Sequence, residues 1–108
     1  MNMNAFSLKG KTAWITGASY GIGFAIAEAY AAAGATIVFN DINQELVEKG
    51  RKAYAEKEID AKGYVCDVTD EDAVQALVKR IEAEVGTIDI LVKNAGIIRR
   101  IPMTEMRI

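Results

Sequence analysis

The sequence predicts an α/β fold: a doubly wound parallel sheet with helices on both faces and elements in the order β-α-β-α-β-α-β. Three observations support this prediction. Short apolar runs alternate along the chain with longer segments of helical periodicity. A glycine-rich turn joins the first run to the first helical segment, and most runs are apolar on both faces, as in parallel sheets. We expect right-handed crossovers between the parallel strands and the strand order 3-2-1-4 of a doubly wound domain.

The first strand and helix lie on either side of the glycine-rich turn. Residues 11–16 form an apolar run of strand length, and residues 22–33 form an alanine-rich amphipathic segment. Gly34 fits the position at which this helix stops.

The second pair begins with the β-branched run 35–39. Asn43 is placed to cap a helix over residues 44–58. Gly50 lies inside this helix, where glycine costs about 1 kcal/mol relative to alanine.

The third strand is expected over residues 61–66. Residues 69–72 then resemble a capping box with Thr69 as the N-cap and aspartate in the place of glutamate. The helix that follows has apolar residues at helical spacing, namely Ala73, Val74, Leu77, Val78, Ile81 and Val85. Gly86 ends it, and residues 88–92 form a fourth strand that Asp89 interrupts.

Length and charge limit the classes of protein to consider. The 108 residues make one domain at most, over positions 1–108, with a modest core. A net charge of −2 gives no electrostatic reason to bind nucleic acid or an anionic membrane. No apolar run approaches the roughly 20 residues of a membrane helix, and no signal peptide is evident. We therefore expect a cytoplasmic protein.

Histidine is absent from the chain, and Cys66 is its one cysteine. These facts exclude a Ser-His-Asp triad, Cys-His catalysis, histidine metal sites and an intrachain disulfide within these residues. Cys66 ends the predicted third strand, where we expect a small buried hydrophobe rather than a reactive thiol.

The glycine turn is the first candidate site. A strand, a tight glycine turn and a helix N-terminus together suit a diphosphate, because glycine lets the backbone approach the anion and the first helical N–H groups bind it. The alternative to a diphosphate site is an ordinary strand-to-helix turn without a ligand. The predicted ligand-binding residues are Gly17, Ser19, Tyr20, Gly21, Ile22 and Gly23.

Asp41 follows the second predicted strand, 24 residues beyond Gly17. A carboxylate there can accept hydrogen bonds from the ribose hydroxyls of an adenosine and would repel a 2′-phosphate. The position therefore favours NAD, with NADP open as the alternative cofactor. The competing interpretation is a solvated turn aspartate that caps the next helix.

The spacing T-G-x-x-x-G-x-G after a first strand resembles the cofactor turn of the short-chain dehydrogenases/reductases. The resemblance runs from Leu8 to about Met106 and implies a Rossmann-type sheet. It also implies that Asp67 binds the adenine amino group while Val68 packs on the ring. Tyr20 agrees with NAD, since turns in this family that prefer NADP often carry a basic residue nearby.

The fourth strand ends in Lys93-Asn94-Ala95-Gly96, which resembles the family's N-N-A-G motif. The resemblance places Asn94, Ala95 and Gly96 beside the cofactor riboses. Lys93 departs from the motif, and its side chain could reach a cofactor phosphate or extend to solvent.

The segments around Asn94 and Asp41 are also similar to those of gluconate 5-dehydrogenases and related sugar-acid dehydrogenases. This narrower resemblance implies that Arg99 and Arg100 lie where the substrate cleft begins, and a guanidinium can bind a carboxylate through two hydrogen bonds. The alternative is two solvated loop arginines.

The family's catalytic Tyr-x-x-x-Lys pair, serine and second asparagine have no match in the chain. Residues 102–108 begin like another helix and then stop, and the fourth strand would form an open edge. We therefore expect the N-terminal, cofactor-binding part of an NAD(P)-dependent oxidoreductase that interconverts a secondary alcohol and a ketone, inactive alone.

A small-molecule substrate, a sugar acid such as gluconate, and a homo-oligomer are expected. Two alternatives stay open. One is a non-catalytic nucleotide-binding fragment that self-associates through the sheet edge. The other, a methyltransferase-like domain, is disfavoured by the glycine spacing.

Overall fold

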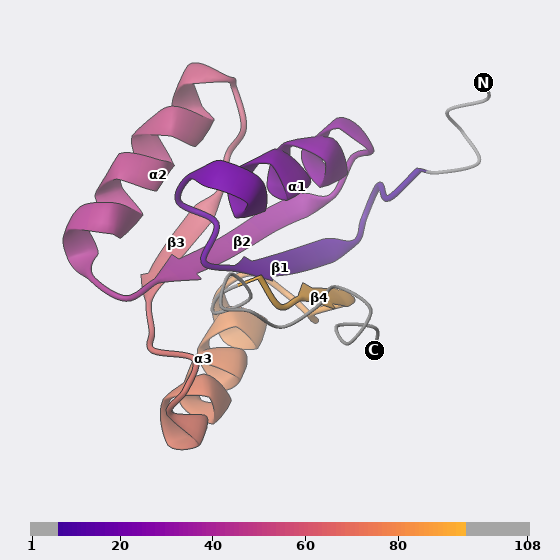
Figure 1. Cartoon of the computed structure of the whole chain (residues 1–108). Coiled ribbons are helices and arrows are strands. Elements are labelled where there is room, and N and C mark those ends of the chain that lie inside the picture. Colours follow the sequence, from indigo (N-terminus) through magenta and orange to yellow (C-terminus); the bar gives the residue numbers. More distant parts are fainter. Residues whose placement is uncertain (1–6, 95–108) are drawn as a thin grey trace, which may run out of the picture.

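The computed structural model describes residues 7–94 and has a four-stranded parallel sheet at its centre (Figure 1). The strands follow the order β3-β2-β1-β4, as expected. The elements are β1 (Thr12–Thr16), α1 (Gly21–Ala32), β2 (Thr36–Asp41), α2 (Gln44–Glu56), β3 (Lys62–Val65), α3 (Glu71–Glu84) and β4 (Ile90–Val92).

The two faces of the sheet are covered by different helices. Helices α1 and α2 lie over one face and α3 over the other, so the doubly wound prediction is confirmed (Figure 1). Successive side chains of a strand point to opposite faces. Ile15 accordingly packs in the cluster under α1 and α2, while its neighbour Trp14 packs in the cluster with α3.

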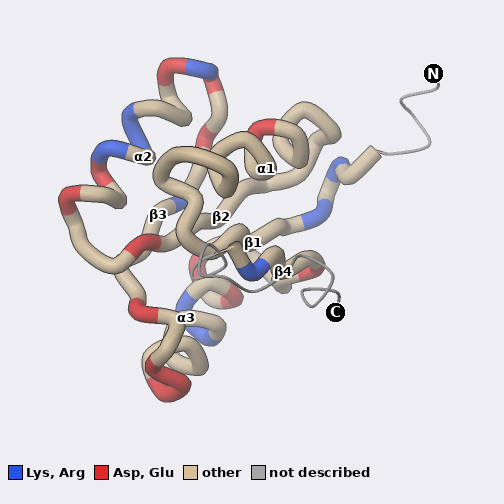
Figure 2. Tube along the Cα trace, viewed as in Figure 1, with Lys and Arg blue, Asp and Glu red and all other residues tan. Residues whose placement is uncertain are grey.

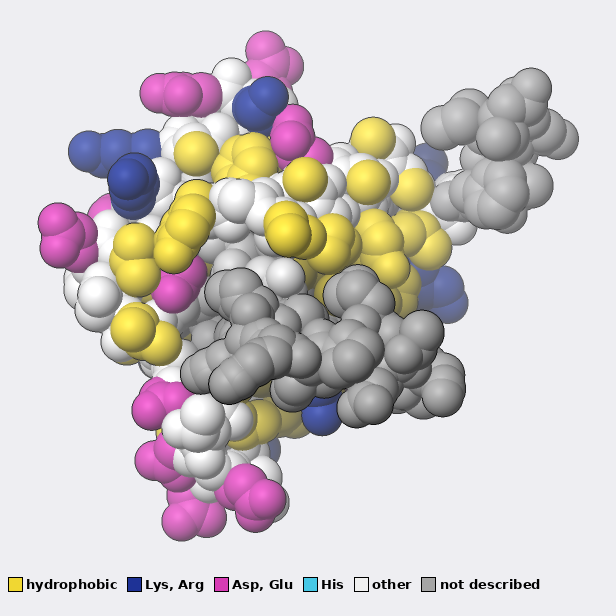
Figure 3. Space-filling view, viewed as in Figure 1, with side chains coloured by type: hydrophobic (Ala, Val, Ile, Leu, Met, Phe, Trp, Pro, Cys, Tyr) yellow, Lys and Arg dark blue, Asp and Glu magenta, His cyan; other side chains and the backbone are white. Residues whose placement is uncertain are grey.

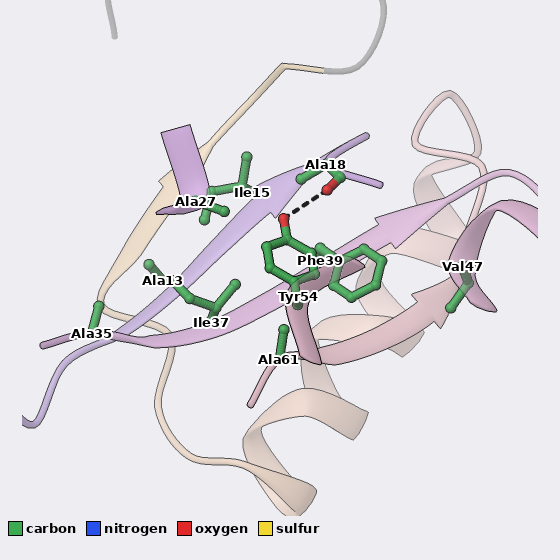
Figure 4. Close-up of a cluster of buried hydrophobic side chains, with 10 residues drawn as sticks. All are labelled: Ala13, Ile15, Ala18, Ala27, Ala35, Ile37, Phe39, Val47, Tyr54 and Ala61. Atoms are coloured by element: carbon green, nitrogen blue, oxygen red, sulfur yellow. Dashed lines mark hydrogen bonds between the residues drawn. The ribbon is translucent and has the colours of Figure 1, made fainter. Parts of the chain in front are cut away.

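Three aromatic rings lie against one another in the core under α1 and α2. Phe39 and Tyr54 lie 5.0 Å apart between ring centroids, and Phe24 stacks on Tyr54 at 4.4 Å (Figure 4 shows the first two). Gly50, expected to weaken α2, lies where a Cβ would come 2.8 Å from Ser19 Cα and 2.9 Å from Phe39. Glycine is needed at this position because α2 approaches the glycine turn closely, although glycine lowers the helix propensity of α2.

The core under α3 follows the predicted helical spacing. Leu77 and Ile81 are buried against Trp14 and Val38, and the remaining apolar positions of the helix pack around them. Cys66 is buried in the same cluster. Burial raises the pKa of its thiol, and the charges of Asp67 and Asp70 raise it further. The prediction of a small buried hydrophobe is confirmed.

Most boundaries differ from the sequence prediction by one or two residues, and three differences bear on the site or have a clear structural reason. β2 extends two residues further than expected, so Asp41 is its last residue rather than a residue that follows it. α3 is capped by the side chain of Asp70, which accepts from Ala73 N at 3.1 Å, and the expectation that Thr69 caps it is wrong. β4 begins at Ile90, because Asp89 instead pairs with Thr12 through its N–H and its carboxylate, each at 2.9 Å.

The charged side chains gather away from the first helix. Figure 3 shows hydrophobic side chains over α1, while charged side chains concentrate on α2 and α3. Within residues 7–94, no helix is long and apolar enough to cross a membrane.

Candidate functional site

The glycine turn between β1 and α1 needs each of its three glycines for a stated reason. Gly17 and Gly21 have φ angles of 63° and 68°, in the left-handed region that side chains with a Cβ rarely adopt. Gly23 is buried in the first turn of α1, where a Cβ would come 2.8 Å from Gly17 O and 2.9 Å from Ala18 Cα. The turn is therefore packed to a closeness that only glycine allows.

The N-terminus of α1 is open. Asn43 and Asp70 cap the other two helices through their side chains, whereas the N-cap of α1, Tyr20, makes no such hydrogen bond. The first turn of α1 contains no acidic residue, while those of α2 and α3 do. The first N–H groups of a helix have no intrahelical acceptor, and its dipole favours an anion there.

Residues 12–27 include no charged residue, and they form the tan stretch through β1 and the start of α1 in Figure 2. Within this stretch, only the backbone N–H groups and the helix dipole can attract a phosphate. Tyr20 and Ile22 are 61% and 73% exposed at its rim.

Asp41 lies at the carboxyl end of β2 and is almost completely buried. Its Oδ1 accepts from Ile42 N at 3.0 Å, and its Oδ2 is buried with no hydrogen-bond partner. The interpretation of Asp41 as a solvated helix cap is wrong, because Asn43 caps α2 by accepting from Leu46 N at 2.8 Å. A buried acceptor without a donor costs free energy. A ligand that donates a hydrogen bond to Asp41 Oδ2 would remove this cost.

Four of the predicted residues meet at one small cavity. Gly17, Asp41, Asp67 and Val68 line a space of about 160 Å³ where β1, β2 and β3 end. Two of these four side chains are carboxylates, and no lysine or arginine lines the cavity. The cavity therefore suits groups that donate hydrogen bonds.

Asp67 is held by the residue two positions on. Its Oδ1 accepts from the hydroxyl of Thr69 at 2.6 Å and from the Thr69 N–H at 2.9 Å. These bonds, the hydroxyl one above all, lower the pKa of Asp67. The carboxylate is exposed and ionised, so it can accept a further hydrogen bond from a ligand.

A larger cavity of about 490 Å³ lies on the α3 side of the sheet. Val68 belongs to both cavities, whereas Lys93 lines only this one, beside Glu71 and Trp14. Of these two cavities, Lys93 therefore lines the one that Gly17 of the glycine turn does not line.

Asn94 contacts the glycine turn directly. Its Nδ2 donates to Gly17 O at 3.1 Å, and its N–H donates to the Thr16 hydroxyl at 2.8 Å. Ser19, in contrast, is 1% exposed and its hydroxyl has no partner. The predicted residues Ala95, Gly96, Arg99 and Arg100 lie outside the described residues.

Asn40 was missed by the sequence analysis. This buried residue accepts from Trp14 Nε1 at 2.8 Å and donates to Cys66 O at 3.0 Å, and its own carbonyl accepts from Gly17 N at 3.0 Å. It therefore ties together the ends of β1, β2 and β3, from which the site residues project. An amide in an otherwise apolar buried run is the signal that could have found it.

Within residues 7–94, no group of three or more histidine, cysteine, aspartate or glutamate residues could hold a metal ion.

The chain was compared with known proteins. The family model of the short chain dehydrogenases matches residues 11–108. A 2-dehydro-3-deoxy-D-gluconate 5-dehydrogenase of Formosa agariphila is 47% identical over 109 residues, which cover 100% of this chain and 41% of the relative. A gluconate 5-dehydrogenase of Gluconobacter oxydans is 45% identical, covering 93% of this chain and 39% of that protein.

Solved structures of similar dehydrogenases agree with this family assignment. The 2-keto-3-deoxy-D-gluconate dehydrogenase of Streptococcus agalactiae has 68% identity and a TM-score of 0.84, covering 94% of this chain and 38% of its own. A gluconate 5-dehydrogenase from Burkholderia cenocepacia, solved in complex with NADP and tartrate, has 41% identity and a TM-score of 0.80, covering 97% and 41%. The chain spans about two fifths of the length of these proteins.

Proposed function

The chain belongs to the short-chain dehydrogenases, and we propose that it forms the dinucleotide-binding part of an NAD(P)-dependent oxidoreductase that interconverts a secondary alcohol and a ketone on a sugar acid. A small-molecule substrate and a homo-oligomeric assembly belong to this proposal. The observation that carries it is the unpartnered Oδ2 of Asp41 in a cavity that Gly17 of the glycine turn also lines, next to a helix N-terminus that has no side-chain cap.

The residues present fit a dinucleotide. Backbone N–H groups at the start of α1 would bind the diphosphate, and the absence of a Cβ at Gly23 keeps the turn close to the helix. Asp41 would accept hydrogen bonds from the adenosine ribose hydroxyls, which supplies the donor that its Oδ2 lacks. Asp67 would accept from the adenine amino group while Val68 packs on the ring.

The charge around Asp41 favours NAD over NADP. A 2′-phosphate at this ribose would meet the Asp41 carboxylate, and the seven residues from 42 to 48 contain no lysine or arginine to offset the repulsion. Like charges in a site without a counter-ion are unfavourable, most of all where burial excludes water.

The cofactor, when bound, accepts or donates the hydride. This chain's part is to hold and orient it, because no tyrosine among the 108 residues is followed by a lysine four positions later. We propose that the proton-transferring pair of the whole protein lies outside this sequence.

A sugar acid is proposed as the substrate. Two relatives are named as dehydrogenases of gluconate or a deoxygluconate, and Arg99 and Arg100 follow Gly96 closely in the chain. A guanidinium there would bind the carboxylate of such a substrate through two parallel hydrogen bonds.

The test is steady-state kinetics of the natural full-length protein with gluconate and NAD or NADP. We expect turnover, and we expect Arg100→Ala to raise the KM for gluconate at least tenfold while the KM for the cofactor changes less than twofold. Absence of turnover with gluconate and related sugar acids would contradict the proposed substrate class. Equal small effects on both KM values would contradict the role of Arg100.

A further inference from the structure

Tyr54 connects helix α2 to the glycine turn. Its side chain is completely buried, with Phe24 stacked on the ring and Phe39 beside it. Its hydroxyl donates to the Ala18 carbonyl at 2.6 Å, the dashed line in Figure 4. Burial, and secondarily the charge of Glu28, raises the pKa of Tyr54. The hydroxyl therefore stays protonated and can donate its hydrogen bond.

The next residue of the turn also rests on α2. A Cβ at Gly50 would lie 2.8 Å from Ser19 Cα and 3.0 Å from Ser19 Cβ, so helix and turn are in direct contact there. Gly50 and Tyr54 are four positions apart and therefore share one face of α2. One face of this helix thus supports two consecutive residues of the turn, Ala18 and Ser19.

The bond from Tyr54 fixes the direction of a peptide group. In a trans peptide the carbonyl and the N–H point in opposite directions. Because the Ala18 carbonyl is held toward the buried Tyr54, the Ser19 N–H points away from it. In the preceding peptide, Asn94 holds the Gly17 carbonyl at 3.1 Å, which directs the Ala18 N–H away from Asn94.

These directions matter to an anion. An N–H group aimed at a diphosphate attracts it, whereas a carbonyl in the same place repels it. Rotation of the peptide between Ala18 and Ser19, through ψ of Ala18 and φ of Ser19, would exchange the places of its carbonyl and its N–H. A fixed donor at the Ala18 carbonyl opposes that reorientation.

We propose that Tyr54 is a positioning residue of the diphosphate-binding turn: by holding the Ala18 carbonyl, it keeps the Ser19 N–H available to the cofactor. This inference rests on the proposed function. It assigns to α2, which bears no predicted ligand residue, a part in cofactor affinity.

The test compares Tyr54→Phe with two controls in the natural full-length protein. Tyr64→Phe removes an equivalent hydroxyl bond, from Tyr64 to Glu84 Oε1 at 2.7 Å, on the opposite side of the sheet. Val47→Ala loosens the packing of α2 in the same core as Tyr54 without touching a turn carbonyl. Melting temperatures, Kd values for NAD and for ADP, and kcat at saturating NAD are measured for all three.

We expect Tyr54→Phe to weaken NAD and ADP alike by about three- to tenfold, the effect of one hydrogen bond, and to leave kcat at saturating NAD within twofold. The two control variants should leave the Kd values for NAD and ADP within twofold, even if their melting temperatures fall as far as that of Tyr54→Phe. Unchanged affinities in Tyr54→Phe overturn the positioning role, and so does an equal loss of affinity in Val47→Ala. If the unsubstituted protein binds neither NAD nor NADP, the proposed function fails first and this inference falls with it.

Discussion

Replacing Gly23 with alanine sets two known effects against each other. Alanine in a helix interior is favoured over glycine by about 1 kcal/mol. The added Cβ would lie 2.5 Å from Asn94 Nδ2, 2.8 Å from Gly17 O and 2.9 Å from Ala18 Cα. Asn94 can rotate away, but two of the three contacts are backbone atoms of the turn.

The cost exceeds the gain. Overpacking of this kind costs about 1–3 kcal/mol, and losing the Asn94–Gly17 hydrogen bond adds roughly 0.5–1.5 kcal/mol. After subtraction of the propensity gain, Gly23→Ala should lower the free energy of unfolding by about 0.5–3.5 kcal/mol. Because the turn must shift to admit the methyl group, we also expect the Kd for NAD to rise at least tenfold.

The assay is urea denaturation together with calorimetric titration of NAD, with Ala25→Gly as the control. Ala25 is exposed on the same helix, so its change to glycine should cost about 1 kcal/mol by propensity and leave the Kd unchanged. A Gly23→Ala protein that is as stable as the unsubstituted one and binds NAD equally well would refute the close-approach argument.

Three further predictions concern stability. Asn40→Leu would leave Trp14 Nε1 and Cys66 O buried without partners, and urea denaturation should show a loss of about 2–4 kcal/mol; a loss below 0.5 kcal/mol would contradict the strand-end network. Asn43→Ala and Asp70→Ala each remove a helix cap, and each should cost about 1 kcal/mol in the same assay, with Thr69→Ala costing less than Asp70→Ala. Burial first, and then the bond to Glu84, raises the pKa of Tyr64 from 10.0 to about 12. The fold therefore favours the neutral phenol, and the stability it contributes is complete below pH 10 and lost as the pH rises toward 12. Unfolding free energies measured between pH 9 and 12 should fall less steeply in Tyr64→Phe than in the unsubstituted protein, and identical slopes would contradict the assignment.

The element order could be predicted because hydrophobic period and glycine placement act locally along the chain, whereas the strand order followed from the expectation of a doubly wound domain. The α3 positions such as Leu77 and Ile81 follow directly from helical spacing. The capping of α3 could not be decided in this way, because Thr69 and Asp70 are both good N-caps. The choice depends on Asp67, whose carboxylate binds the Thr69 hydroxyl and leaves Asp70 at the cap.

The site was predicted less completely than the fold. Gly17, Asp41, Asp67 and Val68 were expected at one edge because parallel strands end together, and they line one cavity. Asn40 and the hydroxyl of Tyr54 were not expected in their roles. Their partners lie 26 and 36 residues away, and such contacts depend on tertiary packing that local patterns do not contain.

We propose that this chain forms an NAD site in which Asp41 binds the adenosine ribose. The most direct test of this proposal is calorimetric titration of the natural full-length protein, and of its Asp41→Asn variant, with NAD and with NADP. We predict that the unsubstituted protein binds NAD at least tenfold more tightly than NADP, and that Asp41→Asn narrows the difference by weakening NAD and relieving the repulsion of NADP. Tighter binding of NADP by the unsubstituted protein, or no binding of either dinucleotide, would contradict the account.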